Sequence, residues 1–140
     1  MKEKRTDSLA VFLNLGGRDF DPAECTRFVG LSPTKVWTQR HEHLRDRVDL
    51  DNVTWSVGFE ERSYDAISDA VDEVLVRVWP YRDKLIAYAE QHGLRITVNC
   101  NVRIYTDAPE YSLSAGTIQR LADLKAGVIM DIFDYREDHL

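Results

Sequence analysis

The stretch FDPAECTRFVGLSPTKVW, residues 20–37, marks a complete transition from strand to helix to strand. Asp21 is a favoured N-cap residue, and Pro22 suits the first turn of a helix. Gly30 ends the helical pattern, because glycine readily adopts the left-handed conformation that closes many helices. The stretch therefore predicts a short helix over residues 21–30. It contains no nucleophile, acid–base pair or phosphate-binding loop.

The same stretch begins a series of short motifs that resembles a known family. The motifs are Phe20-Asp21-Pro22, Leu31-Ser32-Pro33-Thr34, Trp55-Ser56, Leu113-Ser114 and the strand from Gly127 to Phe133. Over roughly residues 8–135 the chain resembles family 4279 among the domains of unknown function. The resemblance implies a compact bacterial α+β domain. It implies no activity and no catalytic residues.

Length and charge bound the class of protein. At 140 residues with 44% apolar side chains, the chain can bury one core without metal or disulfide support. We predict a single domain over residues 8–135, with tails at 1–7 and 136–140. The net charge of −6 disfavours nucleic acid and anionic membranes. No stretch approaches the roughly 20 apolar residues of a membrane helix.

The two cysteines indicate a cellular compartment. Cys25 and Cys100 both lie on otherwise apolar faces, which favours buried, reduced thiols over a disulfide. We therefore expect a cytoplasmic protein that binds neither nucleic acid nor membrane.

The clearest strand pattern covers residues 94–105, which we expect to form the longest strand. Apolar and polar side chains alternate there without a break, so one face is buried and the other meets water. This alternation excludes a parallel sheet covered by helices on both faces. The apolar set is Leu94, Ile96, Val98, Cys100, Val102 and Ile104.

Helical periodicity completes the fold prediction. Residues 65–79 carry an apolar stripe that Pro80 must break, and a second helix follows up to Gly93. A last helix opens at Ser114, carries Ile118, Leu121 and Leu124, and closes at Gly127. The order predicts an α+β fold: a ferredoxin-like split βαβ with an added helix–strand unit, and helices on one face of a largely antiparallel sheet. If residues 34–40 are not a strand, two βαβ halves remain.

The sheet face without helices, called the open face below, carries the candidate binding residues. Asp131 interrupts the apolar strand VIMDIFDY, and Ile129, Phe133 and Phe12 add apolar area to the same face. Two interpretations stay open for Asp131: a cross-strand ion pair with an arginine such as Arg103, or one polar wall of a binding surface. The candidate ligand- or partner-binding residues are Asn14, Ser56, Asn99, Asn101, Arg103 and Asp131.

Metal and catalytic patterns are weak. His41 and His43 would point the same way on an extended segment, and Asp49 or Asp51 could add a ligand. Zinc sites of this spacing usually need a further His or Cys nearby, and neither occurs, so we expect no metal and no cofactor. No serine, cysteine or histidine pattern selects a catalytic set.

The sequence therefore favours a non-enzymatic protein-binding or interaction module. One version is an antitoxin or immunity protein whose acidic surface meets a basic partner. The simplest partner for the open face is a second copy, because symmetric dimers are the commonest soluble oligomers. The alternative is a small-molecule sensor or enzyme that uses the open face or the charged loop at 41–52.

Overall fold

A computed structural model describes residues 7–38, 52–63 and 65–136. The elements in chain order are β1 (Ser8–Gly17), α1 (Pro22–Val29), β2 (Lys35–Thr38), β3 (Val53–Arg62), α2 (Ile67–Val78), η2 (Trp79–Tyr81), α3 (Arg82–His92), β4 (Arg95–Ile104), α4 (Ala115–Asp123) and β5 (Gly127–Asp134). The sequence left open whether residues 34–40 form a strand, and β2 shows that Lys35–Thr38 do.

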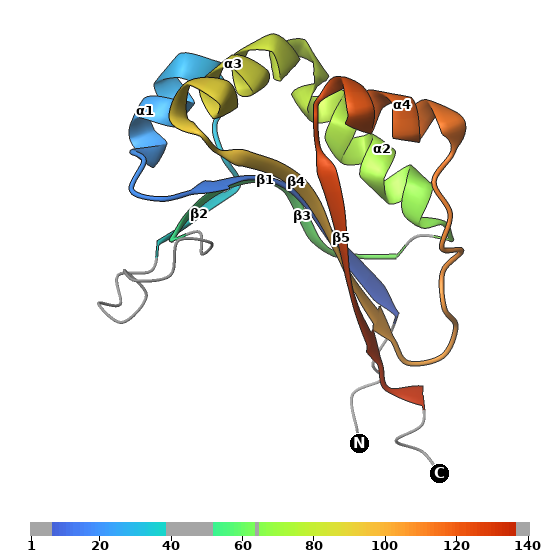
Figure 1. The fold of residues 1–140 in the computed structure, drawn as a ribbon. Coiled ribbons are helices and arrows are strands. Elements are labelled where there is room, and N and C mark those ends of the chain that lie inside the picture. The colour runs from blue at the N-terminus through green and yellow to red at the C-terminus, as the bar shows by residue number, and fades with distance from the viewer. Residues whose placement is uncertain (1–6, 39–51, 64, 137–140) are drawn as a thin grey trace.

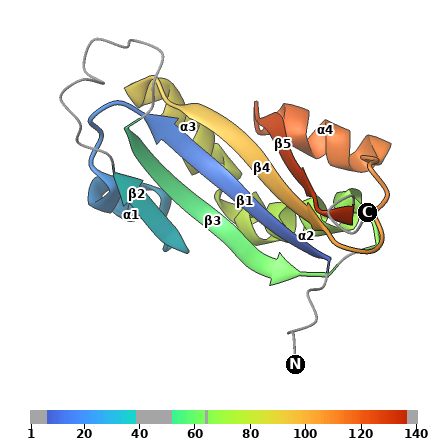
Figure 2. The same ribbon diagram turned by 90° about the horizontal axis from the view of Figure 1, so that it is seen from below.

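The strands form one five-stranded sheet in the order β2-β3-β1-β4-β5. Neighbouring strands are antiparallel except β4 and β5, which run parallel. Figure 1 shows the helices gathered above the sheet. Figure 2 views the molecule from below, with the strands in front of the helices. The protein thus has an α+β fold with a mixed sheet.

The core lies between the helices and the three central strands. In β4, Val98, Cys100 and Val102 are fully buried, whereas Asn99 and Asn101 are half-buried. The predicted alternation is therefore confirmed. The expectation that β4 is the longest strand is wrong, because β1 and β3 also have 10 residues.

The predicted first helix is confirmed with its caps. The Asp21 carboxylate accepts a hydrogen bond from the N–H of Ala23 at 2.9 Å, and Gly30 has a φ of 83°. The indole N–H of Trp55 donates to the hydroxyl of Thr26 at 3.0 Å, which ties α1 to β3. Pro80 lies in η2, a 3-10 turn, and so ends α2 as predicted.

The helix α4 packs on α2 through a buried polar cluster. Thr117, which is fully buried, donates to the Asp72 carboxylate at 2.7 Å and lies 2.9 Å from the Ser68 hydroxyl. Ser114 caps α4 and accepts from the N–H of Thr117. The helix α4 turns Thr117 toward α2 and leaves Ile118 53% exposed, whereas Leu121 and Leu124 are buried.

Asp7 belongs to the fold rather than to a tail. Its carboxylate accepts hydrogen bonds from the N–H groups of Tyr105, Thr106 and Asp107 and from the Thr106 hydroxyl, at 2.5–3.0 Å. Partial burial acts to raise the pKa of Asp7. The hydrogen bonds from Thr106, Asp107 and Tyr105 outweigh that effect and hold the pKa well below its usual 3.8. The predicted tail at residues 1–7 is therefore wrong at Asp7.

We expect Asp7→Ala to lower the free energy of unfolding at neutral pH, because the hydrogen bonds to the carboxylate are lost. Since the carboxylate is partly solvated, the loss should be only roughly 1–2 kcal/mol. A carboxylate with a lowered folded-state pKa stabilises the protein above its unfolded-state pKa and loses this effect as the pH falls through the folded-state value. The wild type and the variant should therefore converge in strong acid. Urea denaturation at neutral and acidic pH checks this, and a gap that stays constant contradicts it.

Candidate functional site

The strand registers bring the six candidate residues together on the open face. Three cross-strand neighbours define its layout: Asn14 opposite Ser56, Phe12 opposite Asn99, and Asn101 opposite Asp131. The face divides into a covered half beside β2 and an accessible half on β4 and β5.

In the half beside β2, side chains of the open face pack on one another and leave little surface to solvent. The hydroxyl of Ser56, which is 4% exposed, donates to the side-chain oxygen of Asn14 at 2.6 Å. Phe12 is only 5% exposed, because it packs over Gly58 and the Lys35 ammonium lies 4.2 Å from its ring centre. The expectation that Phe12 adds exposed apolar area is therefore wrong. Ser56 does not present its hydroxyl to solvent.

The half on β4 and β5 is accessible. The side-chain oxygen of Asn99 accepts from the Thr97 hydroxyl at 3.0 Å. Arg103 lies 3.6 Å from Glu61 of β3 and, within the part of the chain that the structure describes, forms its ion pair there rather than with Asp131. Asp131 therefore stands as an exposed carboxylate on the face of β5 that it shares with Ile129 and Phe133.

The strand β5 is exposed on both of its faces. On the open face Ile129 is 40% and Phe133 46% exposed, and on the helix side Val128 is 36% and Ile132 51% exposed. Four of the ten exposed large hydrophobic side chains in the described ranges thus lie in this one strand. The helix side is covered only in part, because Met130 packs against the core while α4 packs on α2 and leaves Val128 and Ile132 exposed. We call Val128, Ile129, Asp131, Ile132 and Phe133 the β5 surface.

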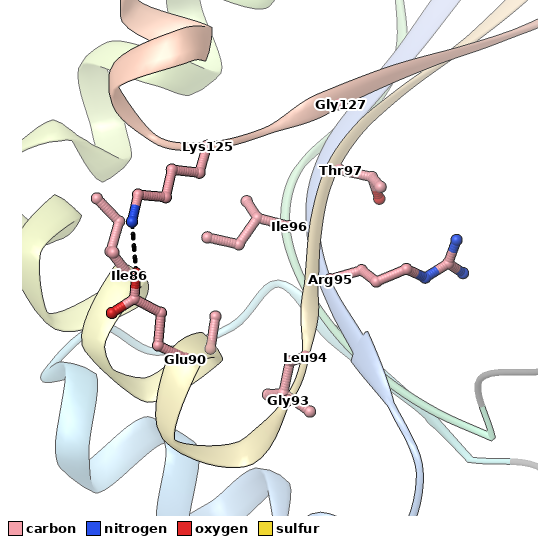
Figure 3. A pocket seen from close by; sticks show the side chains of 10 residues that line it. Ile86, Glu90, Gly93, Leu94, Arg95, Ile96, Thr97, Lys125 and Gly127 are labelled. Carbon is pink, nitrogen blue, oxygen red and sulfur yellow. Dashed lines mark hydrogen bonds and ion pairs between the residues drawn. The ribbon is translucent and has the colours of Figure 1, made fainter. Parts of the chain in front are cut away.

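A pocket of about 460 Å³ opens between α3, β4 and the start of β5 (Figure 3). Ile86 and Ile96 line it, and the ion pair between Lys125 and Glu90, at 2.5 Å, spans one side. In Figure 3 the Arg95 side chain extends to the opposite side of β4. We call this hollow the α3–β4 pocket. It lies on the helix side of the sheet, so it is separate from the predicted open-face site.

The two thiols are buried and unpaired. Burial, with a smaller contribution from Glu24, raises the pKa of Cys25 to about 12, and burial raises the pKa of Cys100 to about 11. Thiols with such values are poor nucleophiles at neutral pH.

Potential metal ligands are dispersed in the part of the chain that the structure describes. In residues 7–38, 52–63 and 65–136, no group of three or more His, Cys, Asp or Glu side chains is placed to hold a metal ion. His41 and His43, and all of the loop at 41–52 except Asn52, lie outside these ranges.

The fold and these surfaces define a small α+β domain with an exposed edge strand. Residues 7–135 match the family described as Domain of unknown function (DUF4279), and the chain belongs to that family. No curated protein and no solved structure matches the chain. Among the helices that the structure describes, none is long and apolar enough to cross a membrane.

Proposed function

We propose that this protein is a non-enzymatic interaction module that binds a protein partner through the β5 surface and the adjoining part of the open face. The concentration of exposed apolar side chains on β5 carries this proposal. Isolated exposed apolar residues are ordinary on soluble proteins, whereas a continuous apolar patch marks an interaction site. Asp131 gives the patch one charged group at its centre.

The shape of the β5 surface favours a macromolecule. An edge strand with apolar side chains on both faces encloses no cavity, but it can accept another strand by backbone pairing. The net charge of −6 would speed association with a basic protein, as in an antitoxin or immunity protein. Asn99, Asn101 and Arg103 would then lie at the polar rim of the contact, while Asn14 and Ser56 support the sheet behind it.

The proposal includes a fold assignment and a location. The order β2-β3-β1-β4, with antiparallel neighbours, supports a ferredoxin-like split βαβ with helices on one face, to which α4 and β5 are added. The free, buried thiols support a cytoplasmic protein.

Photo-crosslinking tests the interaction directly. A photoreactive amino acid at Phe133, introduced in cells that naturally contain this protein, should yield a discrete crosslinked species. The matched control is Val76 on α2, which is 71% exposed and lies outside the β5 surface. Equal crosslinking at the two positions, or none at Phe133, would contradict the proposal.

A second candidate function is small-molecule binding in the α3–β4 pocket. Its volume lies within the range of ligand sites. Apolar walls beside the cation of Lys125 and the anion of Glu90 suit an apolar amino acid, whose carboxylate and ammonium complement these groups.

A thermal-shift screen against metals, nucleotides and amino acids separates the two candidates. The interaction module predicts no large specific shift. A shift given by one ligand class and abolished by Ile86→Trp, which fills the α3–β4 pocket, would establish the second candidate instead.

A further inference from the structure

In the described part of the chain, no strand pairs with the outer edge of β5, and α4 is drawn on that side of β5 in Figure 2. β5 ends the strand order, so its outer backbone groups face no neighbouring strand in the described part of the chain. The opposite edge strand, β2, has only 4 residues and carries Lys35, both common protections against pairing. β5 has 8 residues and contains neither lysine nor proline. Of the two edges, β5 is therefore the one suited to accept a strand.

The charges at the two ends of β5 are already balanced within the chain. Lys125 before the strand pairs with Glu90 at 2.5 Å, and Asp134 at its end pairs with Arg136 at 2.7 Å. Asp131 is the one ionised side chain left within the strand. A partner strand thus has to avoid only a second carboxylate directly opposite Asp131.

We propose that the strand that pairs with β5 is β5 of a second copy, in antiparallel register about a two-fold axis at Met130. This inference rests on the proposed function and names its partner. Such an axis, perpendicular to the sheet, keeps the helices of both copies on the same side and joins two sheets into one. The free backbone groups of β5 then pair with those of β5 in the second copy, and the side chains of the two strands complement each other in this register.

The register follows from the side chains. With Met130 on the axis, Val128 faces Ile132 of the second copy and the exposed apolar residues on the helix side cover each other. On the open face, Ile129 faces Asp131, and Gly127 faces Phe133, a pairing in which the ring covers the glycine backbone. An axis at Asp131 would instead place two carboxylates directly opposite each other, which is destabilising. The Met130 register avoids this contact.

Sedimentation, together with disulfide crosslinking through one introduced cysteine, tests both the partner and the register. Directly opposite residues in antiparallel strands have Cα atoms about 4.5–5.5 Å apart, within the reach of a disulfide. Met130→Cys should therefore crosslink to itself on mild oxidation. Ile132→Cys is the matched control, because the two copies of position 132 lie four residues apart along the strands, about 13 Å. Cys25 and Cys100 are buried and should not contribute.

We expect the wild type to sediment as a dimer at micromolar concentration. Met130→Cys should form the intermolecular disulfide at least about tenfold faster than Ile132→Cys. A dimer without preferential crosslinking at position 130 overturns the β5 register but leaves an interaction module in place. A monomer at high micromolar concentration overturns the second copy as the partner. The proposed function is then tested separately, by the photo-crosslinking experiment at Phe133.

Discussion

The Gly58→Ala variant should lose about 2–3 kcal/mol of unfolding free energy, one of the two largest effects that we expect from a single substitution. A Cβ at position 58 would overlap the carbonyl oxygen of Val11 and lie 2.7 Å from Cα and 2.8 Å from Cδ1 of Phe12. Two of these atoms belong to the backbone of the paired strand β1, so relief requires β1 and β3 to separate. Urea denaturation measures the loss.

Gly116→Ala is the matched control for this prediction. A Cβ there would meet only the end of the Arg120 side chain, at 3.8 Å and 3.9 Å. Because Gly116 lies within α4, alanine should stabilise the protein by roughly 0.5–1 kcal/mol. A lower free energy of unfolding for Gly58→Ala and a higher one for Gly116→Ala would support the packing described for the open face. An unchanged stability for Gly58→Ala would contradict it.

The Ile132→Glu variant should weaken the dimer by about 100-fold or more. In the proposed register each introduced glutamate would face Val128 of the second copy, so the interface would bury two unpaired carboxylates. The same substitution at Val76, which is 71% exposed on α2, adds equal charge outside the β5 surface. Sedimentation equilibrium measures the dimer dissociation constants of Ile132→Glu and Val76→Glu. Equal values for the two variants would contradict the proposal.

Much of the fold was predictable because local signals and packing agree. The period-2 alternation around Val98 and Cys100 requires one buried face, and β4 has it. Asp21 and Gly30 bound α1 through their own backbone preferences, which depend little on the rest of the chain. Pro80 ends α2 for the same reason.

The candidate site was predicted only as a set of residues on one face. Periodicity placed Phe12 and Ser56 on the open face but gave no information on what covers them. Phe12 is covered by Lys35 and packs over Gly58, and Ser56 bonds to Asn14, all across strands that tertiary contacts pair. Helical spacing likewise does not show that Ile118 is exposed while Leu121 and Leu124 are buried. The polar cluster around Thr117 sets the orientation of α4 instead.

Asp131, Ile129 and Phe133 were predicted to lie on the open face, but the position of β5 at the sheet edge and the α3–β4 pocket were missed for different reasons. A strand apolar on both faces is typical of a buried strand, and only the strand order shows that β5 is an edge. The pocket arises from the spacing between α3 and β5, which no local pattern encodes.

A charge-pair rescue tests the central claim, that two copies pair through β5 about Met130. In this register the double variant Val128→Lys with Ile132→Glu places each lysine opposite the glutamate of the second copy. Within one chain the two positions lie about 13 Å apart along the strand, so they cannot pair internally. Sedimentation equilibrium should show that the double variant recovers at least about tenfold of the affinity that Ile132→Glu alone loses. A double variant that dissociates as readily as the single variant would contradict the claim.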